Sequence, residues 1–267
     1  YTSGTTGAPK GVLLSHGGTA FALESWNGPV MGLVPDDVVL SALPLAHSFG
    51  IFGSVMAPLM AGAAVVLVPR FTPRDCLDAI GRRRITVFPG VATMFRRILD
   101  APGLAGADFS SLRYALSGAA PCPWELAQAW RLATGVRIIR GYGMSELFRP
   151  LSYSADDARD VPSAVGRPVP GVEIRIVDED GVEVPRGKVG EIAVRGPNVM
   201  QGYWRQPELT AAALRDGWMH SGDGGRMDED GYVYVVDRMK DMIITGGENV
   251  YSAEVEDAVH GHPAVAE

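Results

Sequence analysis

The first eleven residues bring phosphate-binding chemistry together in one short segment. Y-T-S-G-T-T-G-A-P-K-G combines hydroxyls, glycines and a lysine with almost no apolar side chain to anchor it. Glycines let the backbone approach phosphate oxygens, hydroxyls donate hydrogen bonds to them, and a lysine neutralises their charge. The segment is not a Walker A loop, because Gly4 and Gly7 are only three residues apart and Pro9 precedes Lys10. Its composition favours a loop around an anion; a flexible surface linker is the alternative.

A second polar cluster, R-G-Y-G-M-S-E at residues 140–146, follows a β-like run. Open α/β sheets bind ligands at the carboxyl ends of their strands, so we expect the cluster at such an edge. Tyr142 is suited to stacking on a base. Glu146 is suited to Mg²⁺, which prefers one or two carboxylates plus phosphate oxygens. Taken alone, Glu146 is more commonly explained as a solvated carboxylate at a helix start.

Two further clusters follow in the second half of the sequence. In W-M-H-S-G-D-G-G, residues 218–225, Asp223 stands between glycines and is suited to accept two hydrogen bonds from a ribose diol, although a turn aspartate is an equally simple explanation. In D-R-M-K-D-M-I-I-T-G-G-E-N-V-Y, residues 237–251, charges alternate before an apolar strand and two glycines. Alone, this last cluster indicates a charged linker at a domain boundary.

The elements that must position these clusters change along the chain. Up to about residue 145, the apolar runs V-V-L-S-A-L, A-A-V-V-L-V, I-T-V-F, R-Y-A-L-S and R-I-I-R alternate with segments of helical period at 74–84, 90–100 and 123–133. This alternation predicts an α/β fold with a mostly parallel, layered sheet and helices on both faces. The uncharged stretch 38–68 predicts a strand, a helix over 48–60 and a second strand rather than a membrane span, because Pro and Gly interrupt it.

From about residue 165 the pattern becomes antiparallel. E-I-R-I-V, G-E-I-A-V-R and Y-V-Y-V-V are short runs bounded by D-E-D-G turns, which predict a small β-rich subdomain. After Lys240, a strand, a double glycine and a helix from about residue 252 indicate the start of a C-terminal α+β domain. We therefore expect three units: 1–164, 165–239 and 240–267.

Composition excludes several classes of protein. The 267 residues carry a net charge of −7, which argues against binding nucleic acid through general basicity. The two cysteines are too few for a disulfide scaffold or a zinc site and suggest a reducing compartment. The chain begins at Tyr1 without an initiator Met and stops within an apparently unfinished αβ unit, so we interpret it as an internal fragment.

Read together with P-L-A-H-S-F-G at 44–50 and S-G-A-A-P at 117–121, the four clusters resemble the adenylate-forming superfamily of acyl-CoA synthetases, luciferases and carrier-loading adenylation domains. The order and spacing of the motifs carry this resemblance, which covers essentially the whole chain. It implies a two-step ligase that uses ATP, Mg²⁺ and CoA. A carboxylate attacks the α-phosphate to give an acyl-adenylate and pyrophosphate, and the CoA thiol then displaces AMP.

The resemblance also implies the nucleotide contacts. The β- and γ-phosphates would be held by Ser3, Gly4, Thr5, Thr6, Gly7 and Lys10, and the α-phosphate by Ser145. The nucleotide would be contacted by Gly118, Ala119, Ala120, Tyr142 and Gly143, of which Gly118 to Ala120 and Tyr142 would frame the adenine. The ribose hydroxyls would bind Asp223 and Arg238.

Three residues are implied to act in catalysis: His47, Glu146 and Lys240. His47 would orient the acyl carboxylate or gate its pocket, with a helix-capping histidine as the alternative. Glu146 would bind magnesium. Lys240 matches the hinge about which a C-terminal domain swings between the half-reactions, and Gly246 and Gly247 would line the pantetheine path.

Two expected parts are absent from the sequence. The adenylation lysine of relatives would lie beyond Glu267, and the subdomain that precedes the phosphate loop is missing. We therefore expect the isolated fragment to be poorly stable, with exposed apolar faces, and nearly inactive. A non-catalytic nucleotide-binding remnant is one alternative function; another is an acyl-AMP ligase that loads a carrier protein.

The acid is constrained only in part. The segment 44–50 has no aspartate to pair with a substrate amine, which disfavours α-amino acids. G-V-A-T-M-F-R-R-I-L at 90–99 and S-G-A-A-P look most like fatty acyl-CoA synthetases, with aryl acids and small dicarboxylates still open. Arg96 and Arg97 would pair with a second carboxylate or, more commonly for helix arginines, stay solvated. A cytoplasmic protein with peripheral membrane contact for a long acid is expected; the oligomeric state is not indicated.

Overall fold

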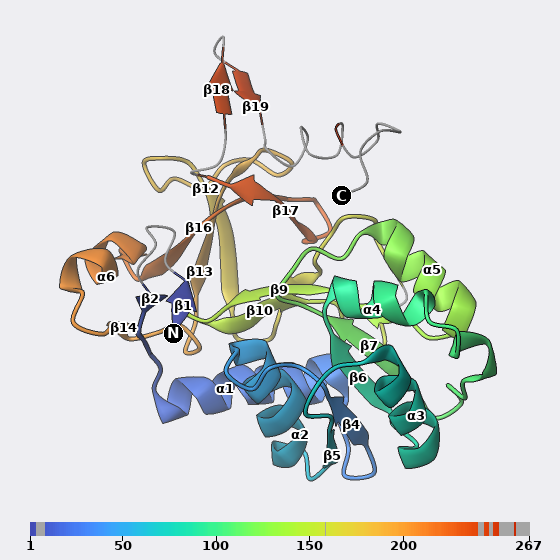
Figure 1. Cartoon of the computed structure of the whole chain (residues 1–267). Coiled ribbons are helices and arrows are strands. Elements are labelled where there is room, and N and C mark those ends of the chain that lie inside the picture. The colour runs from blue at the N-terminus through green and yellow to red at the C-terminus, as the bar shows by residue number, and fades with distance from the viewer. Residues whose placement is uncertain (4–8, 158, 240–242, 246–247, 251–258, 260–267) are drawn as a thin grey trace.

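The computed structural model of the chain describes residues 1–3, 9–157, 159–239, 243–245, 248–250 and 259. A layered α/β part lies beside a β-rich part, and the first strands of the chain lie against the latter (Figure 1). The fold class expected from the sequence is confirmed.

A five-stranded parallel sheet forms the α/β part, in the spatial order β5, β4, β6, β7 and β8. The strands are β4 (Val38–Ser41), β5 (Ala64–Leu67), β6 (Val87–Gly90), β7 (Tyr114–Ser117) and β8 (Ile138–Ile139). Each overlaps one of the five predicted apolar runs. The central strands β6 and β7 are buried along their whole length, which is why their sequences are continuously apolar rather than alternating.

Helices cover both faces of this sheet (Figure 1). On one side lie α3 (Pro73–Arg83), α4 (Ala92–Leu99) and α5 (Trp124–Thr134), which confirm the three predicted helical segments. On the other lie α1 (His16–Trp26) and α2 (Ala57–Met60). Local sequence sets the ends of α3 and α5: the Thr72 hydroxyl accepts a hydrogen bond from the Asp75 amide, and Gly135 ends α5 in the left-handed conformation.

The helix predicted over residues 48–60 is present, but most of it has π-type rather than α-helical turns. Wide π-type turns, η2 (Phe49–Met56), precede α2. A Cβ atom at Gly50 would lie 2.1 Å from the Pro44 carbonyl oxygen, so the segment packs against the turn before it in a way that only glycine permits. Two shorter turns elsewhere are η1 (Asn27–Met31) and η3 (Leu104–Gly106). Among the described residues, no helix has the length and apolar character needed to span a membrane.

Directly after β8, the chain forms two antiparallel sheets. β9 (Gly141–Met144), β10 (Phe148–Ser152) and β11 (Arg167–Pro168) form a three-stranded sheet. A five-stranded sheet contains β12 (Glu173–Val177), β13 (Gly190–Arg195), β15 (Leu214–Arg215), β16 (Trp218–Met227) and β17 (Val233–Arg238). The three predicted antiparallel runs lie in or overlap β12, β13 and β17.

Short strand pairs tie the start of the chain to its second half. β1 (Thr2–Ser3) pairs with β2 (Pro9–Lys10), and β3 (Val12–Leu13) pairs with β14 (Gly202–Tyr203), which leads into α6 (Pro207–Ala213). β18 (Ile243–Thr245) pairs with β19 (Glu248–Val250). The helix predicted from about residue 252 lies outside the described residues.

Aromatic side chains join the layers in two places. Phe88 of β6, Phe95 of α4 and Trp130 of α5 pack together, with Phe95 and Trp130 ring centroids 5.0 Å apart. On the opposite face, Phe148 of β10 packs edge-on against Trp26 of α1, with centroids 5.4 Å apart. The second contact fixes β10, and therefore the β9–β10 turn, against α1.

Candidate active site

The β9–β10 turn carries Glu146 in a buried position. The side chain is 5% exposed, and its Oε1 atom accepts a hydrogen bond of 2.9 Å from the Tyr203 hydroxyl. The Glu146 carbonyl oxygen accepts a hydrogen bond of 2.8 Å from the Met200 amide. The alternative interpretation of Glu146, a solvated carboxylate at a helix start, is wrong, because the residue lies in a strand-to-strand turn away from solvent.

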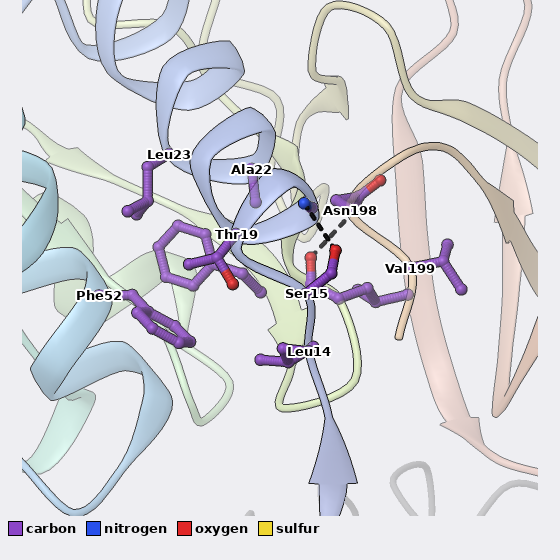
Figure 2. Close-up of a pocket in the computed structure, with 11 residues that line it drawn as sticks. Leu14, Ser15, Thr19, Ala22, Leu23, Phe52, Asn198 and Val199 are labelled. Carbon is purple, nitrogen blue, oxygen red and sulfur yellow. Dashed lines mark hydrogen bonds between the residues drawn. The ribbon is translucent and has the colours of Figure 1, made fainter. Parts of the chain in front are cut away.

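A small cavity beneath this turn is lined by α1, the turn and residues 198–199 (Figure 2). Its lining residues include Leu14, Thr19 and Phe52, and none of the residues that line it is titratable. The Asn198 side chain donates a hydrogen bond of 3.0 Å to the Leu147 carbonyl. The cavity therefore belongs to the packing that supports the Glu146 turn.

The two ends of the predicted phosphate loop are held as a strand pair. Thr2 lies opposite Lys10, and Ser3 opposite Pro9. The Lys10 Nζ atom lies 4.4 Å from the centre of the Tyr203 ring. Gly4, Thr5, Thr6 and Gly7 lie outside the described residues, as does the Ser3 side chain. Of the predicted phosphate-binding set, the structure thus places the Lys10 side chain.

Tyr142 and Asp223, predicted to contact adenine and ribose, are brought together from strands β9 and β16. The Tyr142 hydroxyl donates a 2.5 Å hydrogen bond to Asp223 Oδ2. Arg238 lies opposite Asp223 in the sheet register, with its Nε atom 3.8 Å from Asp223 Oδ1. Burial raises the pKa of the Asp223 carboxyl above its ordinary value, while Tyr142 and Arg238 act to lower it. Burial also raises the Tyr142 pKa well above its usual range.

The S-G-A-A-P segment follows the carboxyl end of β7. Gly118 is buried, whereas Ala119 and Ala120 are exposed, and Ala119 adopts a left-handed backbone conformation with φ of 64°. On β9, a Cβ atom at Gly143 would lie 1.9 Å from the Phe148 carbonyl oxygen, so no side chain fits there. Ser145 is half-buried in the β9–β10 turn, next to Glu146.

His47 is exposed and caps the turn that follows it. Its Nδ1 atom accepts a hydrogen bond of 3.1 Å from the Phe49 amide, as the capping alternative expected. In the neutral ring this leaves the proton on Nε2. The Phe49 ring lies against Gly118, where a Cβ atom would be 3.2 Å from Cε1. Lys240, Gly246 and Gly247 lie outside the described residues.

Residues 1–204 match the AMP-binding enzyme family. The chain belongs to the AMP-binding enzyme family. This confirms the resemblance to adenylate-forming enzymes.

Members of the AMP-binding enzyme family are similar to this chain along its whole length. The feruloyl-CoA synthase of an Amycolatopsis species is 43% identical over 99% of the chain and 54% of that protein. The long-chain-fatty-acid–CoA ligase of Bacillus subtilis strain 168 is 39% identical over the whole chain and 48% of that protein. The ATP-bound crystal structure of MatB from Rhodopseudomonas palustris has a TM-score of 0.93 and 41% identity over the whole chain and 53% of that protein. The chain spans about half the length of the curated relatives it matches.

Tyr203 is a candidate site residue of this AMP-binding enzyme family member that was not predicted from the sequence. Tyr203 contacts both Lys10 and Glu146, so one aromatic ring joins the candidate phosphate-binding lysine to the candidate metal carboxylate. Burial raises the pKa of the Tyr203 hydroxyl, and the nearby Glu146 charge raises it further, which keeps it a hydrogen-bond donor. Tyr203 lies in the sequence G-Y-W at 202–204, and nothing local in that sequence pairs it with Glu146.

A second missed residue is Arg149, on β10. Its side chain is 4% exposed, and its nearest acceptors are the Ser117 carbonyl, the Ser152 hydroxyl and the Ile139 carbonyl, at 3.1, 3.2 and 3.5 Å. Burial lowers its pKa to about 9, so the guanidinium remains charged near neutral pH. The signal was a single arginine inside the otherwise apolar run L-F-R-P-L.

Arg96 and Arg97 do not lie in a comparable environment. Both are exposed on α4, and the Arg97 guanidinium lies 5.2 Å from the centre of the Phe71 ring. The alternative that treats them as solvated helix residues agrees with this position. Cys76 is buried and Cys122 half-buried, both as free thiols, and burial raises the pKa of Cys76 to about 12. At that pKa, Cys76 is a packing residue rather than a nucleophile.

Proposed function

We propose that the complete protein carrying this chain is an ATP-dependent ligase that joins a carboxylic acid to CoA through an acyl-adenylate. The observation that carries the proposal is the buried Glu146, held by Tyr203 beside Lys10. A buried carboxylate that shares Tyr203 with a candidate phosphate-binding lysine is explained when both act on one nucleotide. Family membership and the CoA ligases among its relatives support the same reaction.

The nucleoside would bind at Tyr142, Asp223 and Arg238. Asp223 would accept hydrogen bonds from the ribose diol, which requires the Tyr142 hydroxyl to share or release its bond to the carboxylate. The adenine would lie against Gly118 to Ala120 and the Tyr142 ring. Gly143 would allow the nucleotide to approach the backbone of β9 closely.

The phosphates would lie between the phosphate loop and the β9–β10 turn. Ser3, Gly4, Thr5, Thr6, Gly7 and Lys10 would hold the β- and γ-phosphates, and Ser145 the α-phosphate. Glu146 fits Mg²⁺ because the ion prefers one or two carboxylates together with phosphate oxygens, and Glu146 is a buried carboxylate that the nucleotide phosphates would join. When bound, the ion would neutralise charge on the phosphates during transfer.

The acyl carboxylate would approach the α-phosphate from the side of His47. The neutral His47 Nε2–H can donate a hydrogen bond to that carboxylate while Nδ1 caps the following turn. The chain's contribution is mainly to position two anions and to neutralise their repulsion. We further propose that 1–164 is the α/β part of the large adenylation domain, 165–239 its β-rich subdomain and 240–267 the start of a C-terminal domain. Lys240 would be the hinge, and Gly246 and Gly247 would lie beside the pantetheine of CoA.

The acid is proposed at the level of its class. The relatives are named for ferulate and for long-chain fatty acids at similar identity, so they support a carboxylic acid and leave its side chain open. A fatty acid is the first class to test.

The test is an assay of the complete protein with ATP, Mg²⁺, CoA and a panel of acids. We expect pyrophosphate release that depends on the acid and AMP release that depends on CoA. Glu146→Gln should lower the rate by a factor of about 100 or more, because a buried charge that stabilises the phosphates is lost. Glu208→Gln, on the exposed start of α6, is the matched control and should leave the rate unchanged.

Three results would change the proposal. Pyrophosphate release without CoA-dependent AMP release would favour an acyl-AMP ligase that loads a carrier protein. Nucleotide binding without turnover of any acid would favour a non-catalytic remnant. Full activity of Glu146→Gln would contradict the role of Glu146.

A further inference from the structure

Arg149 is a buried cation for which the described residues supply no counter-ion. Its three hydrogen-bond acceptors are two backbone carbonyls and one hydroxyl, all of them neutral. The influence on its pKa is burial alone, with no contribution from a neighbouring carboxylate. Burying an unpaired charge is unfavourable, so proteins rarely keep one without a use for it.

The aromatic neighbours of Arg149 compensate this cost only in part. The guanidinium carbon lies 5.7 Å from the centre of the Trp26 ring and 5.8 Å from that of Phe49. Contacts at this distance favour a cation, but they replace only a fraction of its hydration. An apolar side chain of similar volume would pack among the same rings without the desolvation cost.

The guanidinium lies directly behind the candidate active site. A Cβ atom at Gly118 would be 3.1 Å from Arg149 Nη1, and one at Gly141 would be 2.3 Å from Nη2. Gly118 begins the segment expected to frame the adenine, and Gly141 precedes Tyr142. The charge therefore touches both walls of the site, on the buried side of Gly118, whereas Ala119 and Ala120 are exposed.

The Arg149 guanidinium also keeps N–H groups for which no acceptor is found among the described residues. Of the five N–H groups that a guanidinium carries, the three bonds in the structure use three, which leaves one on each terminal nitrogen. N–H groups on two neighbouring guanidinium nitrogens can bind the two oxygens of one carboxylate.

We propose that Arg149 binds a second carboxylate at the far end of the acid substrate, so that the protein acts on dicarboxylic acids. This inference rests on the proposed function, since the near carboxylate is the one that would be adenylated. The Phe49 ring, which lies between the His47 turn and Gly118, must turn aside to admit the acid. The chain thereby keeps an uncompensated charge for which the substrate supplies the counter-ion.

The test compares matched acids on the complete protein. Each straight-chain α,ω-dicarboxylic acid of about four to ten carbons is paired with its own monoamide. For at least one length, the wild-type kcat/KM for the diacid should exceed that for the monoamide by about tenfold or more. A wild-type protein that prefers the monoamide at every length would overturn the proposal.

Variants at Arg149 separate recognition from structure. Arg149→Met should reduce kcat/KM for the diacid by about 100-fold, mainly through KM, and should change that for the monoamide by less than about threefold. Arg149→Lys keeps the charge without the fork and should lose about tenfold for the diacid. Arg96→Met, on the exposed face of α4, is the control and should match the wild type. Equal selectivity in Arg149→Met and the wild type would contradict the proposal.

Direct binding keeps this test independent of turnover. Calorimetry without ATP should show the diacid binding at least about tenfold more tightly to the wild type than to Arg149→Met. If no acid supports pyrophosphate release, the proposed ligase function fails, and this difference in affinity still decides the role of Arg149. If Arg149→Met does not fold, Arg149→Lys provides the same comparison. Equal affinities would overturn the inference.

Discussion

Two arginines nine residues apart are equally buried and have opposite surroundings. Arg140 and Arg149 are each 4% exposed. Arg140 follows β8, and its Nη2 atom lies 2.6 Å from Asp160 Oδ1 and 2.8 Å from the Val161 carbonyl oxygen. Arg149 lies on β10, and its acceptors in the described part of the chain are all neutral.

The difference shows that burial alone does not separate a structural charge from a ligand-binding one, whereas the presence or absence of a counter-ion does. Arg140 and Asp160 neutralise each other and tie the end of β8 to the segment that contains Asp160, a structural role. Arg149 is left with an open charge beside Gly118, at the edge where the parallel sheet meets β9. Charges kept without a partner at such an edge are candidates for ligand recognition.

The largest change in the free energy of unfolding is expected when Arg140 is replaced. Arg140→Met should lower the free energy of unfolding by about 3–5 kcal/mol, because it leaves Asp160 largely buried with only the more distant Arg137, 3.4 Å away. Urea unfolding of the complete protein, followed by tryptophan fluorescence, measures the change. A loss below about 1 kcal/mol would show that the ion pair does not hold this region.

A smaller loss of stability is expected at Glu146, whose buried carboxylate is held by the neutral Tyr203 hydroxyl. Tyr203→Phe removes the hydrogen bond that the Glu146 carboxylate accepts from the Tyr203 hydroxyl, and it should lower the free energy of unfolding by about 1–3 kcal/mol. The acid-dependent rate should fall as well, with KM for ATP raised more than kcat is lowered. The matched control is Tyr234→Phe, whose hydroxyl donates a 3.1 Å bond to Asp228 away from the candidate site. Its KM for ATP should stay at the wild-type value. An equal rise of KM for ATP in both variants would contradict a positioning role for Tyr203.

Arg149→Met should affect stability in the opposite direction to Arg140→Met. Replacing an uncompensated buried charge with an apolar side chain of similar length should leave the free energy of unfolding level or raise it by about 1 kcal/mol. The same urea experiment measures it. A loss as large as that of Arg140→Met would mean that Arg149 is a structural residue, and the comparison would no longer hold.

The smallest effect sets the baseline for the series. Arg82 and Asp78 form an ion pair on α3 with side chains that are 75% and 45% exposed. Arg82→Ala should change the free energy of unfolding by no more than about 0.5 kcal/mol, because solvent screens the pair. A larger change would show that exposed arginines also contribute here, and would weaken the contrast with Arg140.

Much of the fold was predictable because burial leaves a clear mark on parallel strands. The continuous apolar runs and the helical segments between them indicated β4 to β8 and α3 to α5 in the correct order. The π-type turns of η2 were not predictable, since they depend on the contact between Gly50 and Pro44. The turn between β9 and β10 at Glu146 was not predicted either, because a glycine-rich strand such as β9 has little apolar pattern.

The candidate site was predictable where motifs known from a family named its residues. Tyr142, Asp223 and Arg238 come from three separate motifs, were named through the family resemblance, and lie together in the structure. Tyr203 and Glu146 are 57 residues apart, and no local pattern reports such a contact. Arg149 shows the same limit, since sequence does not reveal whether a buried charge has a partner.

The assignment of Arg149 to a substrate carboxylate is tested most directly by thermal unfolding with added diacid. A ligand that binds only the folded state raises the melting temperature as its concentration exceeds Kd. The melting temperature of the wild-type complete protein should rise with the preferred dicarboxylic acid and much less with its monoamide, while Arg149→Met should show the same small rise with both. An equal rise for the diacid in the wild type and in Arg149→Met would contradict the assignment.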